Sequence, residues 1–372
     1  MKLSLHITCC LILLPLITRA TAAWSAGTEI DGAPYHTVEE LRSFYKLNAG
    51  GKTTHKGAYG FGDADVNLEL GPGVRELRIG GVQIALARPL QRDTAGNLLI
   101  SREDWVAWVD PILRPTYIAG RTAVKNVIID PGHGGHDTGA RAGGTDESAI
   151  TLQVAHKLKT ELEKQGYQVS LTRAEDQYLS DRQRADATKG AQNAIFLSLH
   201  LNTGRSDYQG ASVYTLAPAE PGTQPRPGNT SDPANAALAY ALQTALTTGA
   251  GAADAGCHHT RFNLLSSVPC PAAWVELGYA TNEAEGAALA SDEYQNTLAH
   301  ALAQGIAAYA HVANPATQIP VQAPRPHVTT KAGSGSSAKT TSAAETSSRS
   351  PQKTAKPQPT PPKRPTTKRN KK

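Results

Sequence analysis

The spacing of apolar residues between about position 124 and position 312 alternates between two patterns. Short continuous apolar runs, such as VII at 127–129 and IFLSL at 195–199, are typical of buried strands. Between these runs the apolar residues recur at helical spacing, at Ile150, Val154, Leu158 and Leu162. Strands that alternate with helices predict an α/β fold with a doubly wound, mostly parallel sheet and helices on both of its faces.

The same patterns predict the remaining elements of this region. Further strands are expected at residues 169–171, 212–216 and 273–275. Further helices are expected at residues 179–190 and 234–248, and a final helix ends near residue 312. Proline and glycine are frequent between residues 217 and 233, which predicts a surface loop.

A small α+β domain is predicted for residues 24–120. Thr37 followed by Glu40 is a capping-box pattern at the start of a helix. Apolar residues alternate on both sides of Gly80-Gly81, which predicts a β-hairpin. A short strand and a helix with two tryptophans follow at residues 98–108. The pattern weakly resembles the copper amine oxidase N-terminal-like modules attached to some wall enzymes, which implies a wall-binding or spacer role.

The first 23 residues are typical of a secretory signal peptide. Lys2 supplies a positive charge, residues 7–17 form an apolar run, and small residues precede a cleavage site near Ala22 or Ala23. The apolar run is short for a membrane span, although an uncleaved N-terminal anchor is an alternative. We therefore expect an exported protein, in the periplasm or in the extracellular space and cell wall.

Residues 313–372 form a basic tail that is rich in Pro, Thr and Lys. The tail has twelve Lys and Arg and one acid, so its net charge is +11; the whole chain carries +5, which leaves −6 for the remainder. With few large apolar residues, the tail cannot bury enough surface to offset chain entropy and is expected to be disordered. Attachment to anionic wall or surface polymers and a solvated tail without a partner are both open. No nucleic-acid partner is expected, because the exported chain has no recognition motif.

Two cysteines, Cys257 and Cys270, remain once the signal peptide is removed. In an exported protein such a pair favours a disulfide, with two free thiols as the alternative. Zinc binding by the pair has less support, because no second ligand cluster lies at zinc-finger spacing.

Three residues that can bind a metal ion lie at strand ends or helix starts of the α/β region. His133 lies in the DPGHGG motif at 130–135, directly after the first strand. Glu147 opens the next helix, and His200 follows the strand at 195–199. In a doubly wound sheet, ligands bind at the carboxyl ends of the strands. Two imidazoles and one carboxylate with a fourth position open are the ligand set of a catalytic zinc site, so we expect one Zn²⁺ per chain.

A second carboxylate, Glu276, follows the apolar strand at 273–275. A carboxylate in a buried strand is unfavourable unless it has a partner or a function, and beside a metal site it can act as a general base. Each of the four residues alone has an ordinary explanation. These are a glycine-rich turn for His133, the helix dipole for Glu147, core packing for His200 and a buried ion pair for Glu276. Their common position at strand ends and a helix start favours one site.

Several short motifs follow one another along this region: IDPGHGG at 129–135, Glu147 with Ile150 and Leu152, LTR at 171–173, Leu179 with Arg182, SLHLN at 198–202, and VELG at 275–278 with Asn282. Residues 127–310 thereby resemble the zinc-dependent N-acetylmuramoyl-L-alanine amidase family, type 3. The resemblance implies that His133, Glu147 and His200 hold zinc and that Glu276 is the catalytic carboxylate. It also implies supporting or substrate-side positions for Arg182 and Asn202, with a catalytic domain at 121–312.

Such an enzyme cleaves the amide bond between N-acetylmuramic acid and L-alanine in peptidoglycan, during wall remodelling, daughter-cell separation or lysis. Ser148-Ala149 and Leu201 depart from the family pattern, but the four principal side chains are all present. A zinc peptidase acting on the stem peptide is one alternative, and a catalytically degenerate wall-binding regulator is another. The first predicts shortened stem peptides, and the second predicts a missing ligand or base. The sequence identifies no protein activator.

Overall fold

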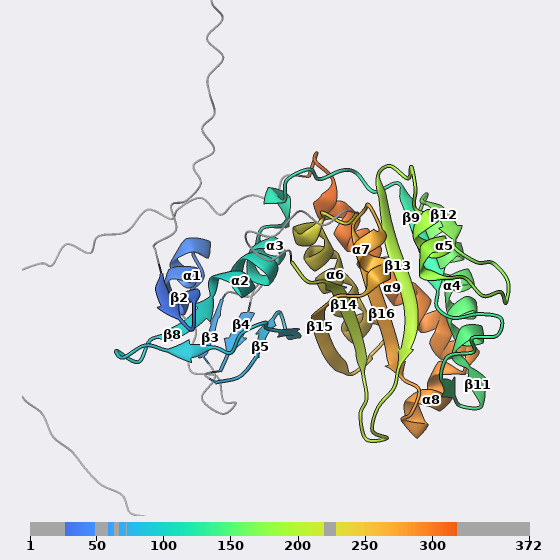
Figure 1. Ribbon diagram of the computed structural model, residues 1–372, viewed down its shortest axis with the longest axis horizontal. Coiled ribbons are helices and arrows are strands. Elements are labelled where there is room, and N and C mark those ends of the chain that lie inside the picture. Colours follow the sequence, from blue (N-terminus) through green and yellow to red (C-terminus); the bar gives the residue numbers. More distant parts are fainter. Residues whose placement is uncertain (1–26, 49–58, 63–66, 72, 219–227, 318–372) are drawn as a thin grey trace, which may run out of the picture. The chain divides into compact units, whose positions relative to one another are not determined.

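The computed structural model describes residues 27–48, 59–62, 67–71, 73–218 and 228–317 of the chain (Figure 1). The predicted signal peptide at 1–23 lies outside the described residues, as do residues 219–227 of the predicted loop and residues 318–372 of the predicted tail. None of the helices in the described part of the chain has both the length and the apolar character needed to cross a bilayer.

A mixed sheet forms the centre of the α/β region. The α/β region contributes six strands to it: β9 (Asn126–Pro131), β12 (Gln168–Leu171), β13 (Ala194–Asn202), β14 (Ala211–Leu216), β15 (Asp254–Thr260) and β16 (Ala272–Tyr279). They lie in the order β12-β9-β13-β16-β14-β15. The first four are parallel, whereas β14 runs antiparallel to β16 and parallel to β15. The predicted α/β fold is confirmed, with one antiparallel junction in a mostly parallel sheet.

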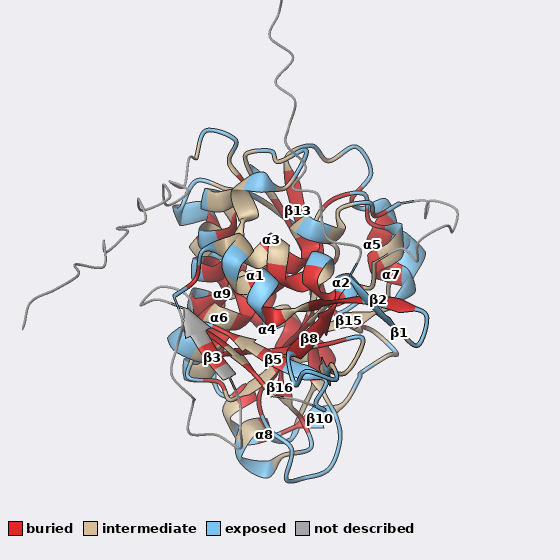
Figure 2. Cartoon of the chain, turned by 90° about the vertical axis from the view of Figure 1, so that its left-hand side faces the viewer, coloured by how far each residue is buried: buried red, intermediate tan, exposed pale blue. Residues whose placement is uncertain are grey.

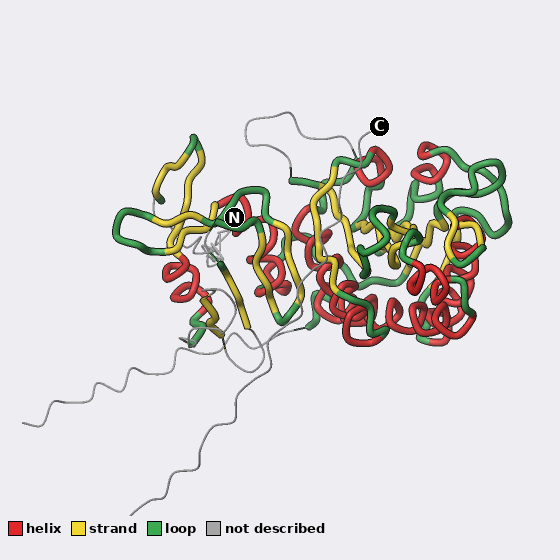
Figure 3. Tube along the Cα trace, turned by 90° about the horizontal axis from the view of Figure 1, so that it is seen from below, coloured by secondary structure: helices red, strands yellow, loops and turns green. Residues whose placement is uncertain are grey.

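Helices cover both faces of this sheet (Figure 3). The long helices α4 (Glu147–Lys164), α6 (Asp232–Gly249) and α9 (Asp292–Ala313) share one apolar core with alternate residues of β13, namely Ile195, Leu197 and Leu199. Phe196 points to the opposite face, where the short helices α5 (Asp181–Asp186) and α7 (Asn263–Ser267) pack. Because successive strand residues face opposite sides, β13 is buried on both (Figure 2). Another short helix, α8 (Glu283–Leu289), follows β16.

Several elements of this region differ from the prediction, and the short helix α7 was not predicted. The helix expected at 179–190 is only α5, which a capping box at Ser180 and Gln183 starts and which ends at Asp186. Strand β15 was not predicted, because its sequence DAGCHHT has no apolar run or clean alternation. Its pairing with β14 and burial of Cys257 come from the tertiary packing.

The segment before residue 120 extends the same sheet. Its strands are β3 (Tyr59–Gly62), β4 (Asn67–Leu70), β5 (Glu76–Ile79) and β6 (Val82–Ala85). The predicted hairpin is confirmed as β5 and β6, and β6 pairs in parallel with β15 through Ile84 and Cys257. Strands β4 and β3 continue outward, each antiparallel to its neighbour.

A second, four-stranded sheet also lies in this segment. Its order is β1 (Thr28–Ile30), β2 (Ala33–Thr37), β8 (Leu98–Ser101) and β7 (Gln91–Arg92). Helix α1 (Val38–Tyr45) starts at the predicted capping box, with Thr37 and Glu40 bonded to each other's backbone N–H. A helical stretch follows β8: α2 (Arg102–Asp104), the π-helix η1 (Trp105–Val109), α3 (Asp110–Leu113) and the 3₁₀-helix η2 (Pro115–Tyr117). The resemblance of the predicted domain at 24–120 to copper amine oxidase N-terminal-like modules stays a prediction.

Asp254 joins the N-terminal segment to the α/β region. Its Oδ2 accepts from the backbone N–H of Gln83 at 2.7 Å and from Arg78 Nη1 at 3.1 Å. Its Oδ1 accepts from Gln243 of α6 at 2.8 Å. Because β15 would otherwise be an edge strand of the α/β sheet, β6 and these contacts protect an exposed edge.

Candidate metal centre

Three side chains converge at the carboxyl ends of the parallel strands. His133 follows β9, Glu147 is the first residue of α4, and His200 lies near the end of β13. One nitrogen of each histidine and one oxygen of Glu147 all lie within 4.8 Å of one another. The structure thus brings together the three residues that the sequence suggests as metal ligands. The three residues belong to separate elements, and they meet because the topology places all three elements at the same edge of the sheet.

Glu147 lies at the centre of this group. Its Oε1 is 3.1 Å from His133 Nε2 and 3.1 Å from His200 Nδ1. The backbone N–H groups of Leu201 and Ala140 donate to its two oxygens. Burial opposes ionisation of this carboxyl, but its hydrogen bonds with the two histidines outweigh burial and hold the pKa of Glu147 well below its usual value. Glu147 is therefore a fixed anion.

His133 is oriented by its backbone and by a second carboxylate. Its φ of 59° lies in the left-handed region, which non-glycine residues seldom adopt. Its Nδ1 lies 2.8 Å from Asp137 Oδ2. Since a carboxylate only accepts, Nδ1 carries the proton in this contact, and Nε2 is left to face Glu147. Sequence reasoning missed Asp137, although a carboxylate four residues after a candidate ligand was a usable signal.

Two glycines allow the close approach of the three side chains. A Cβ on Gly132 would lie 2.3 Å from His200 Cε1, well inside contact distance. A Cβ on Gly139 would lie 2.6 Å from His133 Cδ2 and 2.7 Å from Glu147 Oε2, and the φ of Gly139 is 65°. Any side chain at either position would displace a candidate ligand.

Two buried arginines hold the loop that carries His133. Arg184 donates to Asp130 Oδ1 at 2.7 Å and to the backbone oxygen of His133 at 2.8 Å. Arg173 donates to the backbone oxygens of Pro131 at 2.9 Å and Gly132 at 2.8 Å. Thr172 and Ser198 also donate to the fully buried Asp130. The loop backbone is thus held by two arginines, of which the sequence pointed only to Arg173, as part of the LTR motif at 171–173.

Arg182 and Asn202, the two other sequence candidates, are placed differently. Arg182 is exposed on α5, and Arg184, two residues later, reaches the His133 loop instead. Asn202 ends β13, where its Oδ1 accepts from the backbone N–H of Thr203 at 3.0 Å. A substrate role for either residue stays a prediction.

Glu276 lies on the same sheet face as the candidate ligand His200. Strand register pairs it directly with His200, so both side chains point to one side. Its Oε1 accepts from Trp274 Nε1 at 2.7 Å, whereas its buried Oε2 has no hydrogen-bond partner among the described residues. Burial raises the pKa of Glu276 to about 7; the Trp274 hydrogen bond lowers it and the charge of Glu147 raises it further. A carboxylate with such a pKa can exchange protons near neutrality.

The structure contradicts the predicted disulfide. Cys257 and Cys270 are both free and buried. Cys257 lies in the core shared by α4, α6 and α9, whereas Cys270 lies in the cluster on the other face. The sheet therefore separates the two thiols. Burial raises the pKa of the Cys270 thiol to about 12, so this thiol stays protonated at neutral pH.

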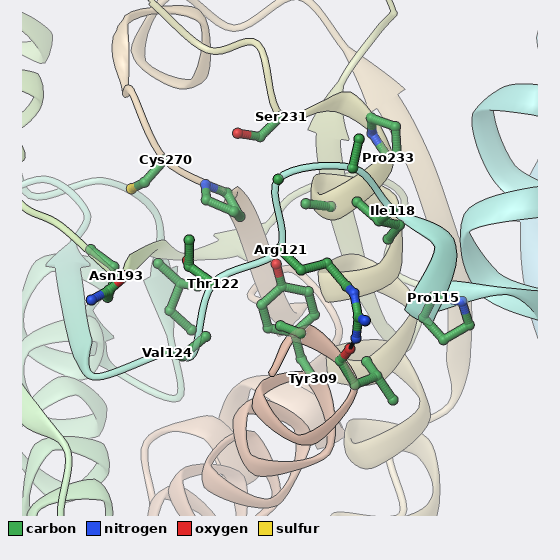
Figure 4. A pocket seen from close by; sticks show the side chains of 18 of the residues that line it. Pro115, Ile118, Arg121, Thr122, Val124, Asn193, Ser231, Pro233, Cys270 and Tyr309 are labelled. Carbon is green, nitrogen blue, oxygen red and sulfur yellow. Dashed lines mark hydrogen bonds between the residues drawn. The ribbon is translucent and has the colours of Figure 1, made fainter. Parts of the chain in front are cut away.

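A cavity of about 340 Å³ lies at the opposite ends of the strands (Figure 4). It is lined by Asn193 just before β13, by Cys270 before β16, and by Tyr309 near the end of α9. Arg121 closes one side of it by donating to the backbone oxygens of Val312 and Asn314. None of the candidate ligands lines this cavity, so it is separate from the metal centre.

The donor atoms fit a divalent cation. His133 Nε2, His200 Nδ1 and Glu147 Oε1 are electron-pair donors, and the two 3.1 Å separations are repulsive unless a proton or cation lies among them. Donors about 2 Å from a tetrahedral zinc ion lie roughly 3.3 Å apart, close to these separations. Two imidazoles and one carboxylate, with Asp137 behind one imidazole, match a catalytic zinc site with its supporting carboxylate.

Comparison with known proteins identifies relatives of the α/β region. The family model described as N-acetylmuramoyl-L-alanine amidase matches residues 127–308. The uncharacterized protein YqiI of Bacillus subtilis is 30% identical over 185 residues, which cover 50% of this chain and 84% of YqiI. The N-acetylmuramoyl-L-alanine amidase LytC of Bacillus subtilis is 28% identical over 50% of this chain but only 35% of LytC. Among solved structures, the N-acetylmuramoyl-L-alanine amidase AmiC2 of Nostoc punctiforme is 32% identical over 50% of this chain and 98% of AmiC2, with a TM-score of 0.44.

Proposed function

The chain belongs to the N-acetylmuramoyl-L-alanine amidase family, and from this premise we propose that it is a zinc-dependent peptidoglycan hydrolase. The bond it cleaves is the amide that joins the lactyl group of N-acetylmuramic acid to L-alanine. His133, Glu147 and His200 hold one zinc ion, and Glu276 is the general base. The observation that supports this proposal most strongly is the convergence of three zinc-type donors within 4.8 Å, with Glu276 paired to His200 on the neighbouring strand.

Zinc in such a site polarises the substrate carbonyl and makes water more acidic. The chain's own residues supply the proton transfers. Glu276 Oε2 has no hydrogen-bond partner among the described residues, so it is available to take a proton from the attacking water. The water oxygen bonds to the amide carbon, the carbon–nitrogen bond breaks, and Glu276 returns the proton to the leaving amine of L-alanine. Asp137 keeps the His133 imidazole oriented while this happens.

The proposed setting is the cell wall. A predicted signal peptide at 1–23 would export the chain to the periplasm or the outer surface, where peptidoglycan is accessible. The basic tail at 313–372 would then add electrostatic attraction to anionic wall polymers, an attraction that salt weakens. A degenerate regulator is disfavoured, because no principal side chain of the site is missing.

Digestion of purified peptidoglycan, followed by mass spectrometry of the products, tests this proposal. An amidase releases intact stem peptides that begin with L-alanine, and a chelator abolishes their release until zinc is restored. Shortened stem peptides would identify a peptidase instead. A protein that gives neither product, while folded and loaded with zinc, would identify a non-catalytic wall protein.

A further inference from the structure

Trp274 connects the candidate ligand His200 to the candidate base Glu276. Its ring lies parallel to the His200 imidazole, with ring centroids 3.7 Å apart and an interplanar angle of 8°. Its indole Nε1 donates to Glu276 Oε1 at 2.7 Å. One side chain therefore contacts both the predicted zinc site and the carboxylate that is predicted to move protons.

Strand register explains how one residue reaches both groups. Across β13 and β16, Ser198 is paired with Trp274 and His200 with Glu276. Trp274 and Glu276 are two positions apart, so they point to the same face of the sheet. A large ring at position 274 that leans along the strand covers the neighbouring His200, and its N–H meets the carboxylate of Glu276.

The indole also packs against an aromatic side chain other than His200. Phe262 packs against it with ring centroids 4.8 Å apart and an interplanar angle of 54°. Tyr214 of β14 is paired with Trp274 across the antiparallel junction, and its ring also contacts Phe262. Aromatic neighbours on adjacent elements restrict the rotamers of Trp274, so its contacts with His200 and Glu276 keep one geometry.

These contacts have two separate consequences for the site. Stacking on Trp274 and close packing against Gly132 restrict rotation of the His200 imidazole, which keeps Nδ1 directed at Glu147. The indole N–H engages Oε1 of Glu276 and is the hydrogen bond that orients this carboxylate, while Oε2 has no partner among the described residues. Removing the N–H frees the carboxylate to rotate, and removing the ring also frees the imidazole.

We propose that Trp274 is a positioning residue of the hydrolase site, which fixes the ligand His200 through its ring and the base Glu276 through its indole N–H. This inference rests on the proposed function, because it assigns Trp274 a role toward that zinc ion and that reaction. Trp274 touches neither the reacting atoms nor the ion, and it acts through the two residues that do.

Two variants of the full chain separate the roles of the ring and the N–H. Trp274→Phe keeps an aromatic ring over His200 but has no N–H, whereas Trp274→Leu has neither. Trp108→Phe is the matched control, because Trp108 also stacks on a histidine, His259, at 4.2 Å, but lies away from the metal centre. Titration calorimetry measures Zn²⁺ binding to the metal-free proteins, and initial rates on a soluble peptidoglycan fragment give kcat and KM.

We expect Trp274→Phe to bind Zn²⁺ within about threefold of wild type while kcat falls about 10- to 100-fold at an unchanged KM. Trp274→Leu should show the same loss of kcat and, in addition, a Zn²⁺ affinity about 10- to 100-fold weaker. Trp108→Phe should change neither quantity. Thermal unfolding of each protein shows whether it is folded.

The inference is overturned if either Trp274→Phe or a folded Trp274→Leu matches wild type in kcat. It is also overturned if the folded Trp274→Leu protein binds Zn²⁺ as tightly as wild type. The wild-type arm tests the proposed function separately. A wild-type protein that neither binds Zn²⁺ nor hydrolyses the fragment refutes both the proposed function and the role of Trp274. An active, zinc-binding wild type whose Trp274 variants behave like it refutes only the role of Trp274.

Discussion

Glu276 is a half-buried residue whose Oε2 atom is buried without a hydrogen-bond partner among the described residues, which makes its charge costly in the metal-free protein. Its folded pKa of about 7 lies above the ordinary 4.5, so between these values the folded protein holds a proton that the unfolded chain has released. The free energy of unfolding therefore falls as pH rises through this window, by at most about 3 kcal/mol. This property belongs to one residue and can be measured without substrate.

We predict that Glu276→Gln stabilises the metal-free protein above pH 7 and has little effect near pH 4.5, because glutamine resembles the protonated carboxyl. Urea unfolding of both metal-free proteins at pH 4.5 and pH 8 measures the difference. A wild type that is equally or more stable than Glu276→Gln at pH 8 would contradict the raised pKa.

Arg184 and Arg182 offer a matched pair two residues apart on the same helix. We predict that Arg184→Met lowers the free energy of unfolding by about 3 kcal/mol, because it leaves the buried Asp130 without its cation. Arg182→Met, at an exposed position, should leave stability unchanged. Chemical denaturation measures both. Equal effects of the two substitutions would contradict the assignment of Arg184 to the His133 loop.

Among single residues, the sequence alone identifies the candidate ligands and the candidate base of the metal centre, but not the roles of the side chains that hold them in place. His133, Glu147, His200 and Glu276 are recognisable because each lies near or just after the end of an apolar strand or opens a helix. Arg182 was named from the family resemblance, and the six-residue helix α5 is too short for its periodicity to show that Arg184 faces inward. The disulfide prediction was wrong because sequence separation says nothing about which face of the sheet each cysteine occupies.

At the scale of elements, the loop after β9 determines whether the donors can meet. We predict that Gly132→Ala weakens Zn²⁺ binding more than tenfold, because the new Cβ would occupy the space of the His200 imidazole. Gly71→Ala is the control, since a Cβ at position 71 meets only Val74 at an ordinary 3.5 Å. Calorimetric titration with Zn²⁺ compares the two variants. Tight binding by a folded Gly132→Ala protein would show that the loop can move aside.

Most helices and strands of the α/β region were predictable because their burial is regular. Buried strands such as β13 carry continuous apolar runs, and α4 has one apolar stripe against the sheet. Strand β15 was not predictable because its polar and glycine residues take part through pairing with β14 and β6, contacts remote in sequence. Its formation depends on tertiary structure more than on local propensity.

At the scale of the whole molecule, the N-terminal segment and the α/β region share one sheet, and Asp254 bonds to both. We predict that Asp254→Ala lowers the free energy of unfolding by about 2 to 3 kcal/mol, because the backbone N–H of Gln83 and the Gln243 amide lose an acceptor. Asp292→Ala removes only exposed contacts, an ion pair with Lys157 and a hydrogen bond from Asn296, and should lower the free energy of unfolding by much less than Asp254→Ala does. Denaturant unfolding distinguishes the two. An Asp254→Ala protein that is as stable as wild type would show that the contacts of Asp254 contribute little to stability.

The central claim of the account is that His133, Glu147 and His200 form a zinc site beside a base that is not itself a ligand. Calorimetric titration of the metal-free wild type, Glu147→Gln and Glu276→Gln with Zn²⁺ tests it most directly. The account predicts one ion per chain for wild type and for Glu276→Gln, and at least about 100-fold weaker binding for Glu147→Gln, which loses a ligand. Equal affinity of Glu147→Gln and wild type, or no binding by wild type, would contradict it.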